Sequence, residues 1–295
     1  MLRYLLALLL SFGLFAQPGG QLKFCLRLEP KTFNPLLVQD DASETIRYLT
    51  GGVLIRMNRL TQELDGELAS KWRVSEAGRR IDFQLRANVQ FSDGTPFSCE
   101  DVAFTIRQLM DPALHTSVGD AFRSAPGAVE TNCTGPNSVM ARFPGAVAAL
   151  AAQFDQVAIL SARSPRKEAA VLGLFYVREH KPGAYVLLDR NPNYWKKDAN
   201  GRRLPYLNSI RLDIQPNREI ELLRFRRGEL DMVSKLDAEM YDRLGGESST
   251  RVVDAGPSLD WEVIFFNQVS RAPIPEKASW SWVVYLSHSP HASCR

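Results

Sequence analysis

The most constraining feature of the sequence is an abrupt join between a turn and a helix, FSDGTPFSCEDVAFTI at residues 91–106. Its Asp-Gly pair favours a tight turn, because glycine accepts backbone conformations with positive φ that other residues resist. Ser98 then predicts the start of a helix over residues 98–110, with Asp101 three residues on in the arrangement of a capping box. This join is architectural and indicates no chemistry, but it is typical of folds that mix strands and helices.

The rest of the chain repeats this mixture of short strands and helices. Alternating apolar and polar residues predict strands at 21–28, 81–86, 89–91, 184–190 and 210–215. Helices are expected from Ser43, over 98–110, within 147–160 and after the cap Asn217. Residues 111–145 are rich in Gly, Pro, Ser, Thr and Asn and are expected to be irregular. The order of elements fits an α/β class better than a barrel or a bundle.

The first sixteen residues, MLRYLLALLLSFGLFA, have the outline of a secretory signal peptide. Arg3 precedes an apolar run that ends near the small residue Ala16. The run is short for a membrane span. An uncleaved signal that anchors the protein is the alternative. We therefore expect an exported, periplasmic protein.

The chain has four cysteines, and in an exported protein these raise the question of disulfides. Cys99 and Cys133 flank one compact segment and are the predicted pair. The alternative is four free, mostly buried thiols. No Cys-x-x-Cys spacing occurs, so the usual zinc and redox motifs have no support.

Composition and motifs argue against several function classes. The formal net charge is +3 and is dispersed, with no basic run interleaved with aromatic residues, so a nucleic-acid partner is not expected. Neither a Gly-x-Ser-x-Gly motif nor a glycine-rich phosphate loop occurs. We therefore predict no catalytic residues, no cofactor and no enzymatic activity.

A series of fragments occurs in a recognisable order along the chain. It begins with EPKTFNPLL, ASETIRYLTGGVLIRMN and LDGELASKWRVSEAGRRIDFQLRANVQFSDGTPFSCEDVAFTI. It continues with DRNPNYWKKDANGRRLPYLNSIRLDI, RRGELDMV and FFNQ. Over residues 22–268 this order closely resembles the family 5 extracellular solute-binding proteins, the dipeptide-, oligopeptide- and nickel-binding components of bacterial ABC importers.

The resemblance implies a type II periplasmic-binding-protein fold with two lobes around a cleft. The lobes close on a ligand by hinge motion, and there is no catalysis. The family usually binds peptides, and some members bind nickel chelates, sugars, opines or haem. The implied partners are a peptide or similar small solute and an ABC permease of the inner membrane. The protein is expected to be a monomer.

Candidate ligand contacts follow from the same resemblance. The loop after the first strand should lie near the cleft, which makes Glu29, Thr32 and Asn34 candidate ligand-binding residues. The alternative is that the Asn-Pro pair in this loop simply forms a turn. Tyr194 and Trp195 suggest a stacking platform for a ligand, but aromatic anchors that pack a long loop are the favoured interpretation.

The sequence departs from the family pattern in two places. The family usually has a Gly-x-Gly-Pro-Phe-like loop where VLGLFYV stands at residues 171–177. The second departure is the tail at residues 269–295, which is atypical for the family. The expected organisation is therefore a signal peptide at 1–16, a first lobe with an inserted subdomain at 22–268 and this tail. Our hypothesis is a frameshift or premature stop near Glu276, which leaves the second lobe largely missing and binding impaired.

Two alternatives remain for the function. His288, His291 and Cys294 follow an H-x2-H-x2-C spacing that suits zinc. A fourth ligand is missing, and an out-of-frame tail can contain such a spacing of His and Cys by chance. No metal site is therefore predicted. The other alternative is a stable fragment that does not take part in transport.

Overall fold

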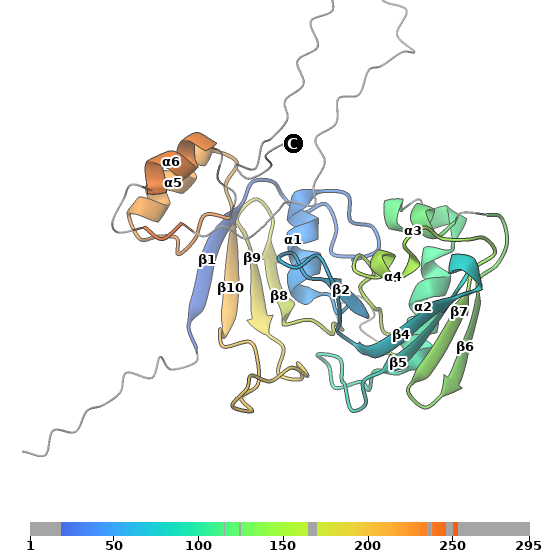
Figure 1. The fold of residues 1–295 in the computed structure, drawn as a ribbon. Coiled ribbons are helices and arrows are strands. Elements are labelled where there is room, and N and C mark those ends of the chain that lie inside the picture. Colours follow the sequence, from blue (N-terminus) through green and yellow to red (C-terminus); the bar gives the residue numbers. More distant parts are fainter. Residues whose placement is uncertain are drawn as a thin grey trace, which may run out of the picture.

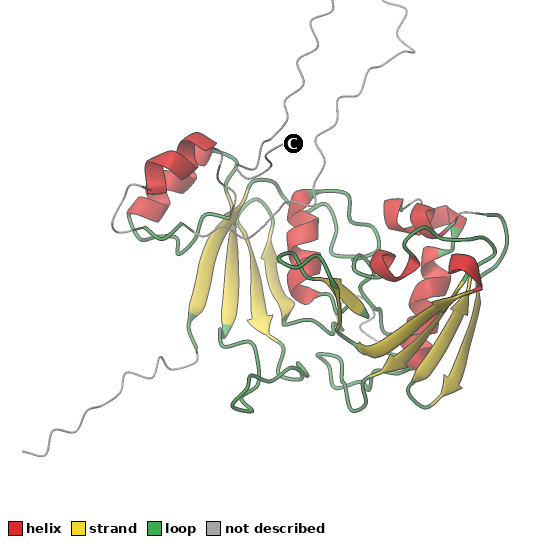
Figure 2. Cartoon of the chain, viewed as in Figure 1, coloured by secondary structure: helices red, strands yellow, loops and turns green. Residues whose placement is uncertain are grey.

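The computed structural model describes residues 19–252, except 115, 124, 165–169, 235, 237 and 246–249. Two four-stranded sheets with helices packed against them dominate this part of the chain (Figures 1 and 2). The predicted α/β class is therefore confirmed. The expected signal peptide at 1–16 and the atypical tail at 269–295 lie outside the described residues. Within the described ranges, no helix combines the length and the apolar character needed to cross a membrane.

The first sheet has the strand order β1-β10-β9-β8. Its strands are β1 (Gln21–Leu26), β8 (Phe175–Lys181), β9 (Tyr185–Arg190) and β10 (Ser209–Ile214). β1 runs parallel to β10, and the other two pairs are antiparallel. Helix α1 (Asp41–Thr50) packs on one face, where Ala42 and Ile46 join Phe24 and Leu212 in a buried cluster.

The start of α1 differs from the prediction by three residues. Asp40 is the N-cap, and its carboxylate accepts a hydrogen bond from the backbone N of Ser43 at 2.9 Å. Ser43, predicted as the cap, lies in the first turn and donates its hydroxyl to Asp40 Oδ2 at 2.8 Å. A carboxylate suits this place better than a hydroxyl, because its charge also interacts favourably with the positive end of the helix dipole.

Helix α5 (Arg218–Arg226) contacts the first sheet on the opposite side from α1. It begins at the predicted cap Asn217, whose Oδ1 accepts from the backbone N of Ile220 at 3.0 Å. Arg224 reaches the sheet and donates to Asp213 Oδ2 at 2.6 Å. Cys25, paired with Asp213 in the register of β1 and β10, is buried under this helix. Both faces of the sheet are thus covered at this end of β1.

The second sheet has the order β4-β5-β7-β6 and is antiparallel throughout. Its strands are β4 (Ala69–Ser75), β5 (Arg80–Leu85), β6 (Glu130–Gly135) and β7 (Ser138–Arg142). The remaining elements are β2 (Ile55–Met57), β3 (Leu64–Gly66), η1 (Glu76–Gly78), η2 (Pro112–Leu114), α3 (Ser117–Phe122), α4 (Leu150–Gln153) and α6 (Ala238–Gly245). Helix α2 (Cys99–Leu109) covers the sheet with Val102, Ile106 and Leu109, the stripe predicted from the sequence, and each of these is almost fully buried.

The start of α2 confirms the prediction from the turn-and-helix join. The buried carboxylate of Asp101 accepts from the backbone N of Ser98 at 2.8 Å, as in a capping box. It also accepts from the backbone N of Ala162 at 2.8 Å, which ties a distant loop to the helix. Cys99 forms the predicted disulfide with Cys133 and so links α2 to β6.

Three local predictions are wrong. Residues 89–91 form only an isolated bridge, in which Gln90 pairs with Pro96 across the turn and Phe91 N donates to Thr95 O at 2.8 Å, and no longer strand. Residues 111–145 are not irregular, since they contain α3, β6 and β7. In 147–160 the helix is limited to the four residues of α4.

The second sheet and α2 belong to a segment inserted between α1 and β8. The chain leaves the first sheet through Gly51 and Gly52 and returns at Gly173. Gly173 N donates to Thr50 O at 2.9 Å, and Ile159 N donates to Gly52 O at 2.8 Å. The segments that leave and re-enter the first sheet therefore lie against each other, with Gly52 and Gly173 at the points of closest contact.

Candidate functional site

The candidate site is the loop of residues 27–40, which leaves the carboxyl end of β1 and enters α1 (Figure 1). It holds all three residues that the sequence suggested as ligand contacts. Because β1 lies at the edge of the first sheet, the loop emerges at the rim of that sheet.

Glu29 fastens this loop to the turn between β8 and β9. Its Oε2 accepts from the backbone N of Gly183 at 2.8 Å, and its Oε1 forms a short contact with Nε2 of His180. These two hydrogen bonds, with His180 the larger cause, hold the pKa of Glu29 below its ordinary value. The ring of Phe33 packs edge-on against the His180 ring with centroids 5.0 Å apart. The carboxylate thus has a positioning role, and a direct contact with ligand stays a prediction.

Thr32 and Asn34 shape the middle of the loop. Thr32 Oγ1 accepts from the backbone N of Asn34 at 3.0 Å, and Asn34 Oδ1 accepts from the backbone N of Leu36 at 3.0 Å. The backbone N of Thr32 donates to Ser43 Oγ at 3.2 Å, which joins the loop to α1. Asn34 therefore forms the turn that the sequence offered as its alternative role. A role of either side chain in ligand binding stays a prediction.

Apolar side chains on the same loop were not anticipated. Leu28 is 61% exposed and Leu37 is 36% exposed. The sequence predicts a strand over residues 21–28, which would include Leu28, but β1 ends at Leu26 and Leu28 lies in the loop that follows it. The loop thus presents apolar surface beside its polar groups, a combination that suits a solute of mixed polarity.

We predict that Glu29→Gln weakens the loop in a pH-dependent way. Since the pKa of Glu29 is lower in the folded than in the unfolded chain, its contribution is fully present at neutral pH and is lost as the pH falls from about 4.3. At pH 7 the variant should lose about 0.5 kcal/mol of unfolding free energy, because the pair is partly exposed. Urea unfolding at pH 7 and pH 3 measures this. A difference from the wild type that persists unchanged at pH 3 would contradict the prediction.

Tyr194 and Trp195 act as anchors of the loop between β9 and β10. Tyr194 is 7% exposed, and burial raises the pKa of its hydroxyl. The Trp195 ring is half-buried, with the Arg86 guanidinium 4.5 Å and the Lys196 ammonium 5.5 Å from the ring centroid. The favoured interpretation of this aromatic pair is confirmed for Tyr194, which has little surface left for a ligand.

The described residues contain no group of three or more His, Cys, Asp or Glu that could hold a metal ion. Burial raises the pKa of the Cys25 thiol to about 11, so this cysteine is protonated near neutral pH and is a poor metal ligand. The spacing formed by His288, His291 and Cys294 lies outside the described residues.

The family model of the bacterial extracellular solute-binding proteins, family 5 (middle region), matches residues 63–277. The chain belongs to this family. The resemblance on which the sequence prediction rested is thereby confirmed.

Two curated relatives show how similar the chain is to known proteins and how much of their length it covers. One is the probable D,D-dipeptide-binding periplasmic protein DdpA of Escherichia coli, 23% identical over 90% of this chain and 54% of that protein. Another is the probable ABC transporter-binding protein of Deinococcus radiodurans, 25% identical over 74% of this chain and 41% of that protein. The chain spans about half the length of the curated relatives it matches.

Solved structures of family 5 proteins share the fold. The ABC transporter-associated periplasmic binding protein DppA of Helicobacter pylori, in complex with the peptide STSA, matches with a TM-score of 0.66 and 21% identity over 79% of this chain and 50% of that chain. Oligopeptide-binding AppA of Bacillus subtilis, in complex with a nonapeptide, matches with a TM-score of 0.66 and 23% identity over 77% of this chain and 46% of that chain. The chain therefore has the type II periplasmic-binding-protein fold over part of its extent.

Proposed function

We propose that this chain contributes the first lobe and its inserted subdomain to the substrate-binding component of an ABC importer, and that the solute is a peptide or a similar small molecule. The observation that carries the proposal is family 5 membership over residues 63–277. Its partner is an ABC permease of the inner membrane, and it works as a periplasmic monomer.

The geometry of the 27–40 loop supports this role for the first lobe. Its exposed Leu28 and Leu37 offer apolar contact, and the first half of the loop is held at two points, by Glu29 to the β8–β9 turn and by Thr32 to α1. A wall fixed in this way loses little conformational freedom on binding, which favours affinity. The Cys99–Cys133 disulfide supports an oxidising compartment such as the periplasm.

Hydrogen–deuterium exchange of the purified chain with a pool of di- and tripeptides tests the proposal. We expect added peptides at about 1 mM, a concentration that detects weak binding, to protect backbone amides within residues 27–40. Glycerol at the same concentration is the control and should protect nothing. Unchanged exchange across the described residues would overturn the proposal.

Thermal stabilisation by the same peptide pool separates a closing cleft from a single wall. Ligand that binds only the folded state raises the melting temperature by mass action. We expect a small shift or none, because the candidate contacts described above all come from one lobe. A rise of several degrees would instead show a complete, closing cleft and would exclude the non-transporting fragment.

A further inference from the structure

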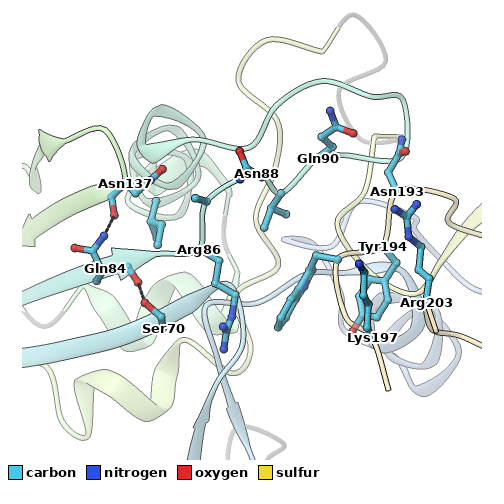
Figure 3. A pocket seen from close by; sticks show the side chains of 14 residues that line it. Ser70, Gln84, Arg86, Asn88, Gln90, Asn137, Asn193, Tyr194, Lys197 and Arg203 are labelled. Atoms are coloured by element: carbon cyan, nitrogen blue, oxygen red, sulfur yellow. Dashed lines mark hydrogen bonds between the residues drawn. The ribbon is translucent and has the colours of Figure 1, made fainter. Parts of the chain in front are cut away.

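A cavity of about 680 Å³ lies at the end of the first sheet that is remote from the 27–40 loop. Its walls come from residues 84–90, at and after the end of β5, and from residues 193–203, in the loop between β9 and β10 (Figure 3). The 193–203 segment precedes β10, whereas the 27–40 loop follows β1, which is parallel to β10. The six paired residues of these strands span about 20 Å, so the cavity is separate from the candidate peptide site.

The charge of the cavity wall is of one sign. Arg86, Lys197 and Arg203 line it, and none of its lining residues is acidic. Figure 3 shows Lys197 and Arg203 beside each other on the wall that faces Gln84 and Asn137. A concave surface with one sign of charge concentrates counter-ions of the other sign.

Two carboxylates near this wall, Glu67 and Asp198, are already paired with other cations, Lys196 and Arg202. Lys196 Nζ lies 2.6 Å from Glu67 Oε1, and Arg202 Nε lies 2.9 Å from Asp198 Oδ2. The Tyr206 hydroxyl and Arg202 hold the pKa of Asp198 at about 2, so this carboxylate is ionised and engaged with them.

Lys196 and Arg202 are each followed in the sequence by a second cation, Lys197 and Arg203, and these second cations line the cavity. An isolated antiparallel β-bridge pairs Lys197 with Arg203. Residues directly opposite in such a bridge have their side chains on the same face, with Cβ atoms about 5 Å apart, and like charges there repel. Arg203 donates to the backbone O of Pro192, and the described residues supply neither cation with a carboxylate. An anion bound between them would relieve the repulsion.

Polar and apolar groups complete the cavity. Amide side chains of Asn88, Gln90 and Asn193 can hydrogen-bond hydroxyl groups, and Leu85, Val89 and Trp195 add apolar surface. The Arg86 guanidinium is held in place by hydrogen bonds to the backbone O atoms of Glu67 and Gly66 and by the Trp195 ring. The volume lies within the range of small-molecule sites and exceeds what a bare phosphate ion needs.

We propose that this cavity binds a small phosphate-bearing polyol, with Lys197 and Arg203 on the phosphate and the amide side chains on the hydroxyls. An arginine beside a lysine suits phosphate, because guanidinium binds two oxygens at once and ammonium adds a point charge. The same chemistry exists free in solution, as in glycerol 3-phosphate, and on a membrane, as in the headgroup of phosphatidylglycerol.

Isothermal titration of the purified chain with glycerol 3-phosphate tests the proposal. We expect a dissociation constant below about 1 mM in about 50 mM salt, and weaker binding as the salt rises. The double variant Lys197→Gln/Arg203→Gln should weaken binding about tenfold or more. Its melting temperature without ligand should stay close to that of the wild type, because the removed repulsion between the two cations offsets the loss of the hydrogen bond from Arg203 to Pro192 O.

The matched control is Lys181→Gln/Arg227→Gln, which removes the same charge from exposed positions outside the cavity lining. This control should bind glycerol 3-phosphate within about twofold of the wild type. Equal loss of affinity in both double variants would show a diffuse charge effect and overturn the proposal.

Vesicle co-sedimentation distinguishes the two sources of the ligand. Binding to vesicles that contain phosphatidylglycerol, lost in Lys197→Gln/Arg203→Gln and absent with phosphatidylcholine alone, assigns the site to a lipid headgroup. Binding of free glycerol 3-phosphate without vesicle binding assigns it to a soluble phosphate ester. Binding of neither probe overturns the proposal.

Discussion

Replacing Cys99 with alanine and Cys133 with serine lowers the free energy of unfolding by about 4 kcal/mol. The two cysteines are 34 residues apart, and their disulfide closes a loop that runs from the start of α2 to β6. Without the link, the unfolded chain gains the entropy of that open loop, whereas the packing of the folded state changes little. Urea unfolding of the oxidised wild type and of the double variant measures the difference.

The reduced wild type is the control for this disulfide prediction. Alanine suits position 99 because that side chain is buried, and serine suits position 133 because that residue is exposed. The reduced wild type and the double variant should therefore unfold at about the same urea concentration. Coincident midpoints for the oxidised wild type and the double variant would contradict the prediction.

Features set by short stretches of sequence could be predicted. The start of α2 depends on Ser98 and Asp101, three residues apart, and its buried stripe follows the helical period. The strands β5, β9 and β10 alternate apolar and polar residues, and each was placed to within about a residue. Such signals reside in the residues that form the element, so no partner has to be known.

Elements whose burial is set by distant partners could not be predicted. In β7, Val139 and Ala141 face the core under α2, and Met140 on the other face is also buried, between Asp82 of β5 and Asn132 of β6. β6 is mostly exposed and shows no alternation at all, although it pairs with β7. Neither pattern resembles a half-buried strand, and the high Gly, Pro, Ser, Thr and Asn content of residues 111–145 predicts irregular structure instead.

The candidate site shows the same limit. Glu29 could be placed in a functional loop, but His180 and Gly183 lie 151 and 154 residues away in sequence. In the cavity at the other end of the first sheet, the sequence shows the adjacent cations Lys196-Lys197 and Arg202-Arg203. Which member of the Lys196-Lys197 pair is neutralised depends on Glu67, 129 residues away. Pairing across such distances is fixed by the fold, and a single sequence carries no local mark of it.

Gly173→Ala should destabilise the protein by about 3 kcal/mol, the upper part of the range for overpacking. A Cβ atom at this position would lie 2.3 Å from the backbone O of Thr50 and 2.4 Å from its backbone C. Both atoms belong to the last turn of α1, so relief requires a shift of main chain and cannot come from a side-chain rotation. The φ of Gly173 lies outside the left-handed region, so the expected loss is steric and owes nothing to backbone conformation.

Gly245→Ala is the matched control for Gly173→Ala. Gly245 ends α6 and has no heavy atom within 4 Å of its added Cβ, so the same substitution there should be neutral or slightly stabilising. Gly52→Ala should behave like Gly173→Ala, because its Cβ would meet that of Leu172 at 2.4 Å, on the same crossing of the chain. Urea unfolding of all three variants compares them directly. If Gly173→Ala unfolds at the same midpoint as Gly245→Ala, the crossing between α1 and β8 tolerates a side chain and is not the tight junction that joins the inserted segment to the first sheet.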